Sequence, residues 1–163
     1  MARALELYDL WSRYQPEERG VLVAFASIHG HTALAARELA DMLHGLGVKT
    51  RLFGLAREDW AEAVAQAFRY SGMVLAASSY DAGVFTPMAQ FLYRLKIKNL
   101  QNRVVGLVEN GSWGPTALRT MQASLAELKN MTVVEPTVTI RSALNADSRA
   151  GLERLADAMA RAI

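Results

Sequence analysis

Three short segments of the sequence combine hydroxyl, glycine, histidine and aromatic residues, and each follows a run of apolar residues. The first has hydroxyl groups at both ends and one glycine in its middle; its residues are Ser27, Ile28, His29, Gly30, His31 and Thr32. Backbone N–H groups in such a bend can point at one place, and a helix that begins there adds positive potential. We therefore expect a phosphate-binding loop. The alternative is an ordinary turn in which Thr32 caps the helix.

The second and third segments supply polar atoms and aromatic rings. The second spans 78–86, which is long for a strand-to-helix connection, and contains Ser79, Tyr80, Asp81, Ala82 and Gly83. The third spans 109–115 and contains Asn110, Gly111, Ser112 and Trp113. A tryptophan between two glycines fits an aromatic plate for a flat ligand better than it fits a packed core. The alternative for the second segment is that Tyr80 and Phe85 only pack over the edge of a sheet.

A phosphate loop, polar atoms for the edges of a ring and aromatic plates together predict a site for flavin mononucleotide (FMN). A phospho-receiver domain is the competing interpretation, and it needs acidic residues at the end of the first strand and an aspartate as the last residue of the third strand. Here those places hold Ala24-Phe25-Ala26 and Ala77. The sequence therefore argues against a receiver domain.

The elements that must position these segments are strands alternating with helices. Three runs are apolar throughout, as in strands covered on both faces; they are 21–26, 73–77 and 104–108. In two further runs, 48–53 and 137–140, apolar and polar residues alternate, as in half-exposed strands. One amphipathic helix is expected over 31–46. Four more are expected to begin at residue 58, at residue 86 with Thr86 as the N-cap, at residue 114 and at about residue 147. This order predicts an α/β fold, a flavodoxin-like three-layer sandwich with a five-stranded parallel sheet of order 2-1-3-4-5 and helices on both faces. The three segments then meet at the C-terminal edge of the sheet, where ligands bind.

Upstream of this domain, which we expect over 21–163, residues 1–20 form a separate piece. Ala4, Leu7, Tyr8 and Trp11 make a short helical stripe, and residues 14–20 are typical of a linker. The piece is either a helix packed on the domain or a junction to a neighbouring domain.

Composition excludes several other classes. The 163 residues fit one domain at about 150 residues per domain, and the absence of cysteine excludes disulfides, iron–sulfur clusters and thiol chemistry. Three histidines leave little for a zinc or di-iron site, and a net charge of +2 does not indicate nucleic-acid binding. No apolar run is long enough to span a membrane, and the charged N-terminus argues against a signal peptide. We expect a cytoplasmic domain. Its basic residues Arg94, Lys96, Lys98 and Arg103 should lie at the edge opposite the site, on a solvated face or in contact with another domain.

The three segments resemble motifs of the flavodoxin-like domain of flavodiiron (type A) flavoproteins. Residues 27–32 resemble the phosphate loop S-M-Y-G-N-T, and 79–92 resemble T-Y-N-N-G-x-F-P-P-M-A-D-F-L. Residues 109–117 resemble G-S-Y-G-W-S-G-E-A, with Trp113 on the tryptophan. Residues 1–20 resemble the segment that joins the family's metallo-β-lactamase-like di-iron domain to its flavodoxin domain.

The resemblance implies non-covalent FMN binding and electron transfer. In the family, the flavin takes electrons from rubredoxin or a reductase and passes them to a di-iron site that reduces oxygen or nitric oxide, with dimerisation bringing flavin and iron together. It implies that Ser27, Ile28, Gly30, His31 and Thr32 hold the phosphate, that Ser79, Tyr80, Asp81, Ala82 and Gly83 line the isoalloxazine ring, and that Asn110, Gly111, Ser112 and Trp113 complete the other side. No side chain is expected to act as acid, base or nucleophile.

The di-iron ligand motif H-x-E-x-D is missing, so the resemblance implies a di-iron domain outside this sequence, and a homodimer is an expectation. The chain is either an excised fragment or a stand-alone relative. Two other functions stay open, a stand-alone NAD(P)H or quinone reductase and a flavin-free ligand-binding module.

Four residues depart from the family motifs. His29 and His31 replace tyrosine and asparagine, and a histidine beside a phosphate dianion tends to keep its proton, so FMN affinity should weaken as the pH rises through neutrality. Asp81 and Glu109 replace asparagine and glycine. A carboxylate near the ring would disfavour the anionic reduced flavin and lower the second reduction potential; the alternative is that both side chains point to solvent.

Overall fold

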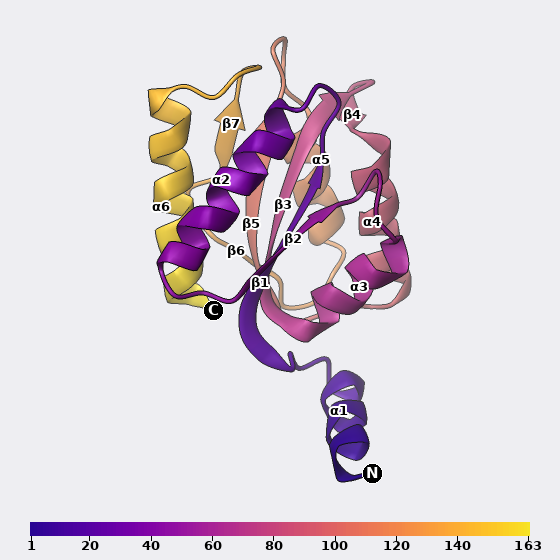
Figure 1. Cartoon of the computed structure of the whole chain (residues 1–163). Helices are drawn as coiled ribbons and strands as arrows, with labels where there is room; N and C mark the ends of the chain where they lie inside the picture. Colours follow the sequence, from indigo (N-terminus) through magenta and orange to yellow (C-terminus); the bar gives the residue numbers. More distant parts are fainter.

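The computed structural model describes all 163 residues, as a sheet between two sets of helices (Figure 1). The helices are α1 (Ala2–Ser12), α2 (His31–Gly45), α3 (Trp60–Arg69), α4 (Thr86–Ile97), α5 (Ala117–Leu125) and α6 (Ala146–Ala162). The strands are β1 (Glu18–Ala26), β2 (Thr50–Gly54), β3 (Tyr70–Tyr80), β4 (Gly83–Val84), β5 (Val104–Asn110), β6 (Thr132–Val133) and β7 (Val138–Ile140). Helices α2 and α6 cover one face of the sheet, and α3, α4 and α5 cover the other. None of the helices has both the length and the apolar character needed to cross a membrane.

The sheet has the predicted order. Its main path is β2-β1-β3-β5-β6, and every pair along this path is parallel. The fifth place is shared by two short strands, because β6 and β7 both pair with β5. The predicted order 2-1-3-4-5 is therefore confirmed. Two short strands were not predicted: β6, which shares the fifth place with the predicted β7, and β4, which pairs antiparallel with β3.

The central strands are buried on both faces, as their unbroken apolar runs predict. In β1, Leu22, Ala24 and Ala26 pack in the cluster under α3, α4 and α5. Val21 and Val23 pack in the cluster under α2 and α6. Burial of one such leucine or valine side chain contributes about 1.5–3 kcal/mol, so β1, β3 and β5 give the C-terminal edge of the sheet a well-packed base.

The connection after β3 is a tight hairpin, which corrects the expectation of a long loop over 78–86. Strand β3 continues to Tyr80, which pairs with Gly83 of β4. Asp81 and Ala82 form the turn, with φ of 51° and 59°. Positive φ at both central residues is the type I′ pattern, which favours asparagine and glycine. An alanine held in this region costs about 1–2 kcal/mol.

Two helix starts also differ from the expectations. Helix α4 begins at Thr86 with Phe85 as its N-cap residue, so Thr86 is the first helical residue and not the cap. Helix α5 begins at Ala117 with Thr116 as its N-cap residue, and not at residue 114, where Gly114 has a φ of 54° that is not helical.

The N-terminal segment stands apart from the sheet. Helix α1 buries none of its residues and projects from the end of the domain opposite β4 and β7 (Figure 1). The side chains of Leu5, Tyr8 and Trp11 are exposed. The linker is shorter than expected, because β1 already begins at Glu18, which pairs with Tyr70 of β3.

Arg103 anchors this segment from inside the domain. Its side chain is buried, so it does not belong to the solvated basic face expected from the sequence. The guanidinium donates to the carbonyl oxygens of Tyr14 (2.7 Å), Gln101 (2.7 Å), Phe68 (2.8 Å) and Ala67 (3.2 Å). Two of these carbonyls lie in the last turn of α3, whose dipole favours a cation. Burial lowers the pKa of Arg103 to about 10, so the group stays charged at neutral pH.

Replacing Arg103 by methionine should lower the free energy of unfolding by about 2–3 kcal/mol, because four buried or half-buried carbonyls lose their donors. Urea unfolding of the Arg103→Met variant measures this. Arg119 is exposed and makes no hydrogen bond or ion pair, so Arg119→Met is the matched control and should change stability by less than about 0.5 kcal/mol. Equal stability of the two variants would contradict the anchoring role.

Replacing Ala82 by glycine should raise the free energy of unfolding by about 0.5–1 kcal/mol, because glycine adopts positive φ without a Cβ clash. The same change at Ala158 in α6 should lower stability, since glycine weakens a helix interior. Thermal or urea unfolding of Ala82→Gly and Ala158→Gly compares the two. A loss of stability in both variants would argue against the left-handed turn.

Candidate functional site

The start of α2 has backbone donors without acceptors. Gly30 is the N-cap residue, with a φ of 88°, and no side chain caps the helix. The backbone N–H of Gly30 donates to Ser27 Oγ at 3.0 Å, whereas the N–H groups of His31, Thr32 and Ala33 make no hydrogen bond within the chain. The alternative in which Thr32 caps the helix is therefore wrong. Donors left free at a helix N-terminus suit an anion.

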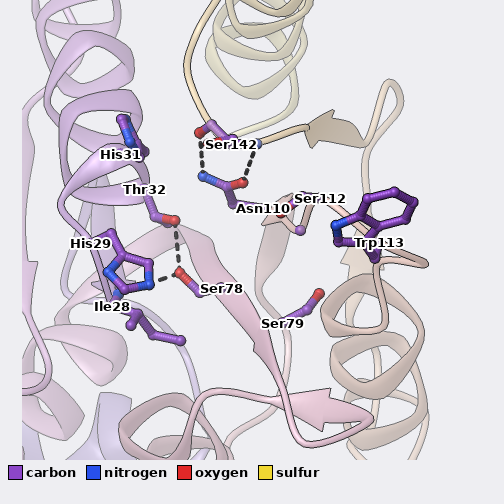
Figure 2. A pocket seen from close by; sticks show the side chains of 11 residues that line it. Ile28, His29, His31, Thr32, Ser78, Ser79, Asn110, Ser112, Trp113 and Ser142 are labelled. Atoms are coloured by element: carbon purple, nitrogen blue, oxygen red, sulfur yellow. Dashed lines mark hydrogen bonds between the residues drawn. The ribbon is translucent and has the colours of Figure 1, made fainter.

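Thr32 is held by the neighbouring strand instead. It is buried, and its Oγ1 lies 3.0 Å from Ser78 Oγ at the end of β3. Ser78 Oγ also accepts a hydrogen bond of 3.4 Å from the N–H of Ile28 (Figure 2). Ser78 was not among the predicted site residues, although its place directly after the apolar run of β3 was a signal for it. It fixes the loop 27–30 to the sheet.

The loop 111–116 carries Trp113 at its tip. The indole is 95% exposed, and Figure 2 shows its ring turned away from His29 and Thr32. The end of this loop is held by Ser79, whose Oγ accepts from the N–H groups of Thr116 (2.9 Å) and Ala117 (3.1 Å). The hydroxyl of Ser79 thus caps α5, a role that the sequence did not indicate.

Asn110 holds a fourth loop that was not predicted to join the site. Its side-chain amide donates to the carbonyl of Ser142 at 2.8 Å and accepts from the N–H of Ser142 at 2.9 Å (Figure 2). Ser142 has a φ of 69°, a conformation that is uncommon for serine. Because both hydrogen bonds go to the backbone of a residue 32 positions away, no local pattern marks Ser142.

The side chain of Glu109 neither points to solvent nor lines the cavity beside Thr32, the two positions considered from the sequence. It is buried, and its carboxylate accepts from the N–H of Leu118 at 2.8 Å and from Thr139 Oγ1 at 2.9 Å. The side chain lies beneath the start of α5.

The loops enclose a cavity of about 310 Å³ at the C-terminal edge of the sheet. Nine predicted residues line it together with Ser78 and Ser142, namely Ile28, His29, His31, Thr32, Ser79, Asn110, Gly111, Ser112 and Trp113. Tyr80, Asp81 and Ala82 line a second hollow, which Ser79 and Trp113 also border. Ser27 and Gly30 line a third hollow together with Ile28.

Gly83 borders none of these hollows; its carbonyl accepts from Thr116 Oγ1 at 2.7 Å. The chain has no group of three or more histidine, aspartate or glutamate side chains that could hold a metal ion.

The sequence is similar to two curated relatives named anaerobic nitric oxide reductase flavorubredoxin, from Pectobacterium carotovorum and Pectobacterium atrosepticum. Each is 22% identical over 128 residues, which are 77% of this chain and 25% of the relative. The chain thus spans a quarter of the length of these relatives. No family model matches the sequence.

The fold is shared with solved structures of two kinds. Rubredoxin oxygen:oxidoreductase from Desulfovibrio gigas matches 99% of this chain with a TM-score of 0.91 and 17% identity, over 40% of its own length. The flavodiiron protein from Giardia intestinalis matches 99% with a TM-score of 0.87 and 18% identity, again over 40% of its length. A flavodoxin from the domain Archaea matches 87% of this chain and 96% of its own, with a TM-score of 0.75 and 17% identity. The comparisons confirm the resemblance read from the sequence: the chain is a flavodoxin-like domain, similar to flavodiiron proteins over nearly its whole length.

Proposed function

We propose that the chain binds FMN non-covalently at the C-terminal edge of the sheet and transfers electrons through it. The observation that carries this proposal is the set of free N–H groups at His31, Thr32 and Ala33. His31 and Thr32 line the cavity of about 310 Å³, which the exposed indole of Trp113 also lines. Free amides match a phosphate, and the indole matches a planar ring. The same fold in flavodoxins supports the flavin as the ligand.

The phosphate would lie against the predicted residues Ser27, Ile28, His29, Gly30, His31 and Thr32. Gly30 allows this arrangement, because its φ of 88° turns the backbone into the helix without a Cβ clash. Binding here would give acceptors to the three free amides, whose N–H groups carry the positive end of the α2 dipole. The hydroxyls of Thr32 and Ser78 bond to each other and keep this cradle in place.

The ring would lie among the residues of the other two segments. Ser79, Tyr80, Asp81, Ala82 and Gly83 would line one side, and Asn110, Gly111, Ser112 and Trp113 the other. Two of these side chains already form hydrogen bonds within the chain: Asn110 with the backbone of Ser142, and Ser79 with the N–H groups at the start of α5. We therefore infer that these segments meet the ring edge mainly through backbone groups and that Trp113 covers a ring face.

The chemistry of electron transfer belongs to the flavin, which accepts and releases electrons when it is bound. The residues of the chain bind and orient it and exclude water from its face. None of them has to act as acid, base or nucleophile.

The wider role we propose is relay of electrons from a donor such as rubredoxin or a reductase to a di-iron site on another domain, with residues 1–20 as the junction. Flavodiiron structures match 98–99% of this chain, whereas flavodoxins match 87–88% and leave about 20 of its 163 residues unmatched. The N-terminal segment has that length, and α1 exposes apolar side chains that a neighbouring domain could cover. A cytoplasmic homodimer, in which one subunit's flavin serves the other's iron site, belongs to the same proposal.

Purified protein should bind one FMN per chain, with a shifted visible spectrum and quenched flavin fluorescence, and should show negligible NADH–quinone turnover on its own. Trp113→Ala should weaken FMN binding about tenfold, the usual effect of losing an aromatic stacking partner. The matched control is Trp11→Ala on α1, at the opposite end of the domain (Figure 1), and it should leave FMN affinity unchanged. Protein that takes up no FMN would point to a flavin-free binding module, and unaided turnover to a stand-alone reductase.

FMN affinity should fall several-fold as the pH rises from 6.5 to 8.5. The phosphate is mainly a dianion over this range and is attracted by a protonated imidazole but not by a neutral one, so binding that involves His29 and His31 should be favoured at the lower pH. Titrations of the wild type and of a His29→Gln, His31→Asn double variant measure the slope. The double variant should bind with nearly constant affinity, and His44→Gln, at the far end of α2, should behave as wild type. An equal slope in all three proteins would remove the histidines from phosphate binding.

A further inference from the structure

Glu109 is the only acidic residue among the buried residues of the chain. It forms no ion pair. A buried carboxylate is unfavourable unless hydrogen bonds replace its water. The two that it accepts come from the N–H of Leu118, in the first turn of α5, and from the hydroxyl of Thr139 in β7. The positive end of the α5 dipole further favours a negative charge at this place.

These contacts close the loop that carries Trp113. Glu109 lies near the end of β5, just before the loop, and Leu118 lies just after it. The carboxylate therefore ties the two ends of the loop together across nine residues. Ser79 accepts from the two preceding amides, so the N–H groups of the N-cap residue Thr116 and of Ala117 and Leu118 all donate to side chains from β3 and β5.

Thr139 connects the same carboxylate to the neighbouring strand. Glu109 and Thr139 are partners in the parallel register of β5 and β7. The next pair in that register is Asn110 and Ile140. The side chain of Asn110 is hydrogen-bonded to the backbone of Ser142, which lies two residues after Ile140. One side of the site is thus built from consecutive residues of β5 that each fix a different loop.

We propose that Glu109 is a positioning residue, whose carboxylate holds the loop 111–116 so that Trp113 is presented to the flavin; this rests on the proposed function. The flavodiiron motif that this segment resembles has glycine at the position of Glu109, and a glycine makes neither contact. The anchor is therefore a property of this chain's own sequence. Glu109 acts through the loop and does not itself touch the ligand cavity.

The test compares Glu109→Gln with Glu109→Met. Glutamine keeps an acceptor for the N–H of Leu118 and a donor for the Thr139 hydroxyl, whereas methionine keeps the length and removes both contacts. Amide hydrogen exchange of the flavin-free protein should show at least about tenfold faster exchange over 111–118 in Glu109→Met, the effect of losing hydrogen bonds to a charged group. Glu109→Gln should exchange like wild type. Glu153 is exposed and makes no hydrogen bond or ion pair, so Glu153→Met is the matched control and should also behave as wild type.

FMN titration of the same proteins is the second readout. Glu109→Met should bind FMN about tenfold more weakly, and Glu109→Gln should restore affinity to within about threefold of wild type. Should Glu109→Met fail to fold, Thr139→Val removes one of the two contacts and should give a smaller change in the same direction.

Two results would overturn the proposal: wild-type exchange over 111–118 in Glu109→Met, or faster exchange there with unchanged FMN affinity. If the wild type bound no FMN, the proposed function would fall, and the flavin role of Glu109 with it. The exchange rates would still show whether Glu109 holds the loop.

Discussion

Backbone N–H groups that lack acceptors at the start of α2 are the constraint on which the site depends. A buried or half-buried N–H without a partner is unfavourable, and native proteins rarely leave several together. At the start of α2, Thr32 is buried, Ala33 is half-buried and His31 is exposed, and none of their N–H groups has an acceptor in the chain. The starts of α3, α5 and α6 are capped by Asp59, by Ser79 with Glu109, and by Asn145. Helices α1 and α4 also lack a side-chain cap, but of these three helices only α2 contributes residues to the cavity at the C-terminal edge of the sheet.

The ends of β3 and β5 turn this local feature into a site. Ser78 and Asn110 are register partners on these strands, and Ala77 and Glu109 are the pair before them. Ser78 fixes the loop before α2, Asn110 fixes the loop after β7, and Glu109 fixes the start of α5. The polar residues at the edge of the sheet thus act mainly as supports for loops. The ligand is left to meet backbone amides and the exposed aromatic side chains.

The sequence predicts the large features of the fold because they depend on local patterns. Unbroken apolar runs identify β1, β3 and β5 as central, and right-handed connections then leave few strand orders. The three segments at the C-terminal edge follow directly from this order. The glycine bend at 27–32 could be found because Gly30 and its neighbouring hydroxyls lie within six residues.

Features that depend on distant partners could not be predicted. Arg103 is part of a basic stretch in sequence, but three of the carbonyls to which it donates are distant in sequence, two at the end of α3 and one at Tyr14. Glu109 and Asn110 look like free ligands until Leu118, Thr139 and Ser142 are brought to them by the fold. The hairpin at Asp81 and Ala82 was missed because its turn lacks the glycine that usually marks a two-residue connection.

Binding of a phosphate by the amides at the start of α2 is tested most directly by comparing the affinities of the chain for FMN and for riboflavin. The two ligands share the ring and the ribityl chain and differ only in the phosphate. Isothermal or fluorescence titration should find riboflavin at least about a hundredfold weaker than FMN, because it loses several hydrogen bonds to a charged group. Equal affinity for the two ligands would contradict the account.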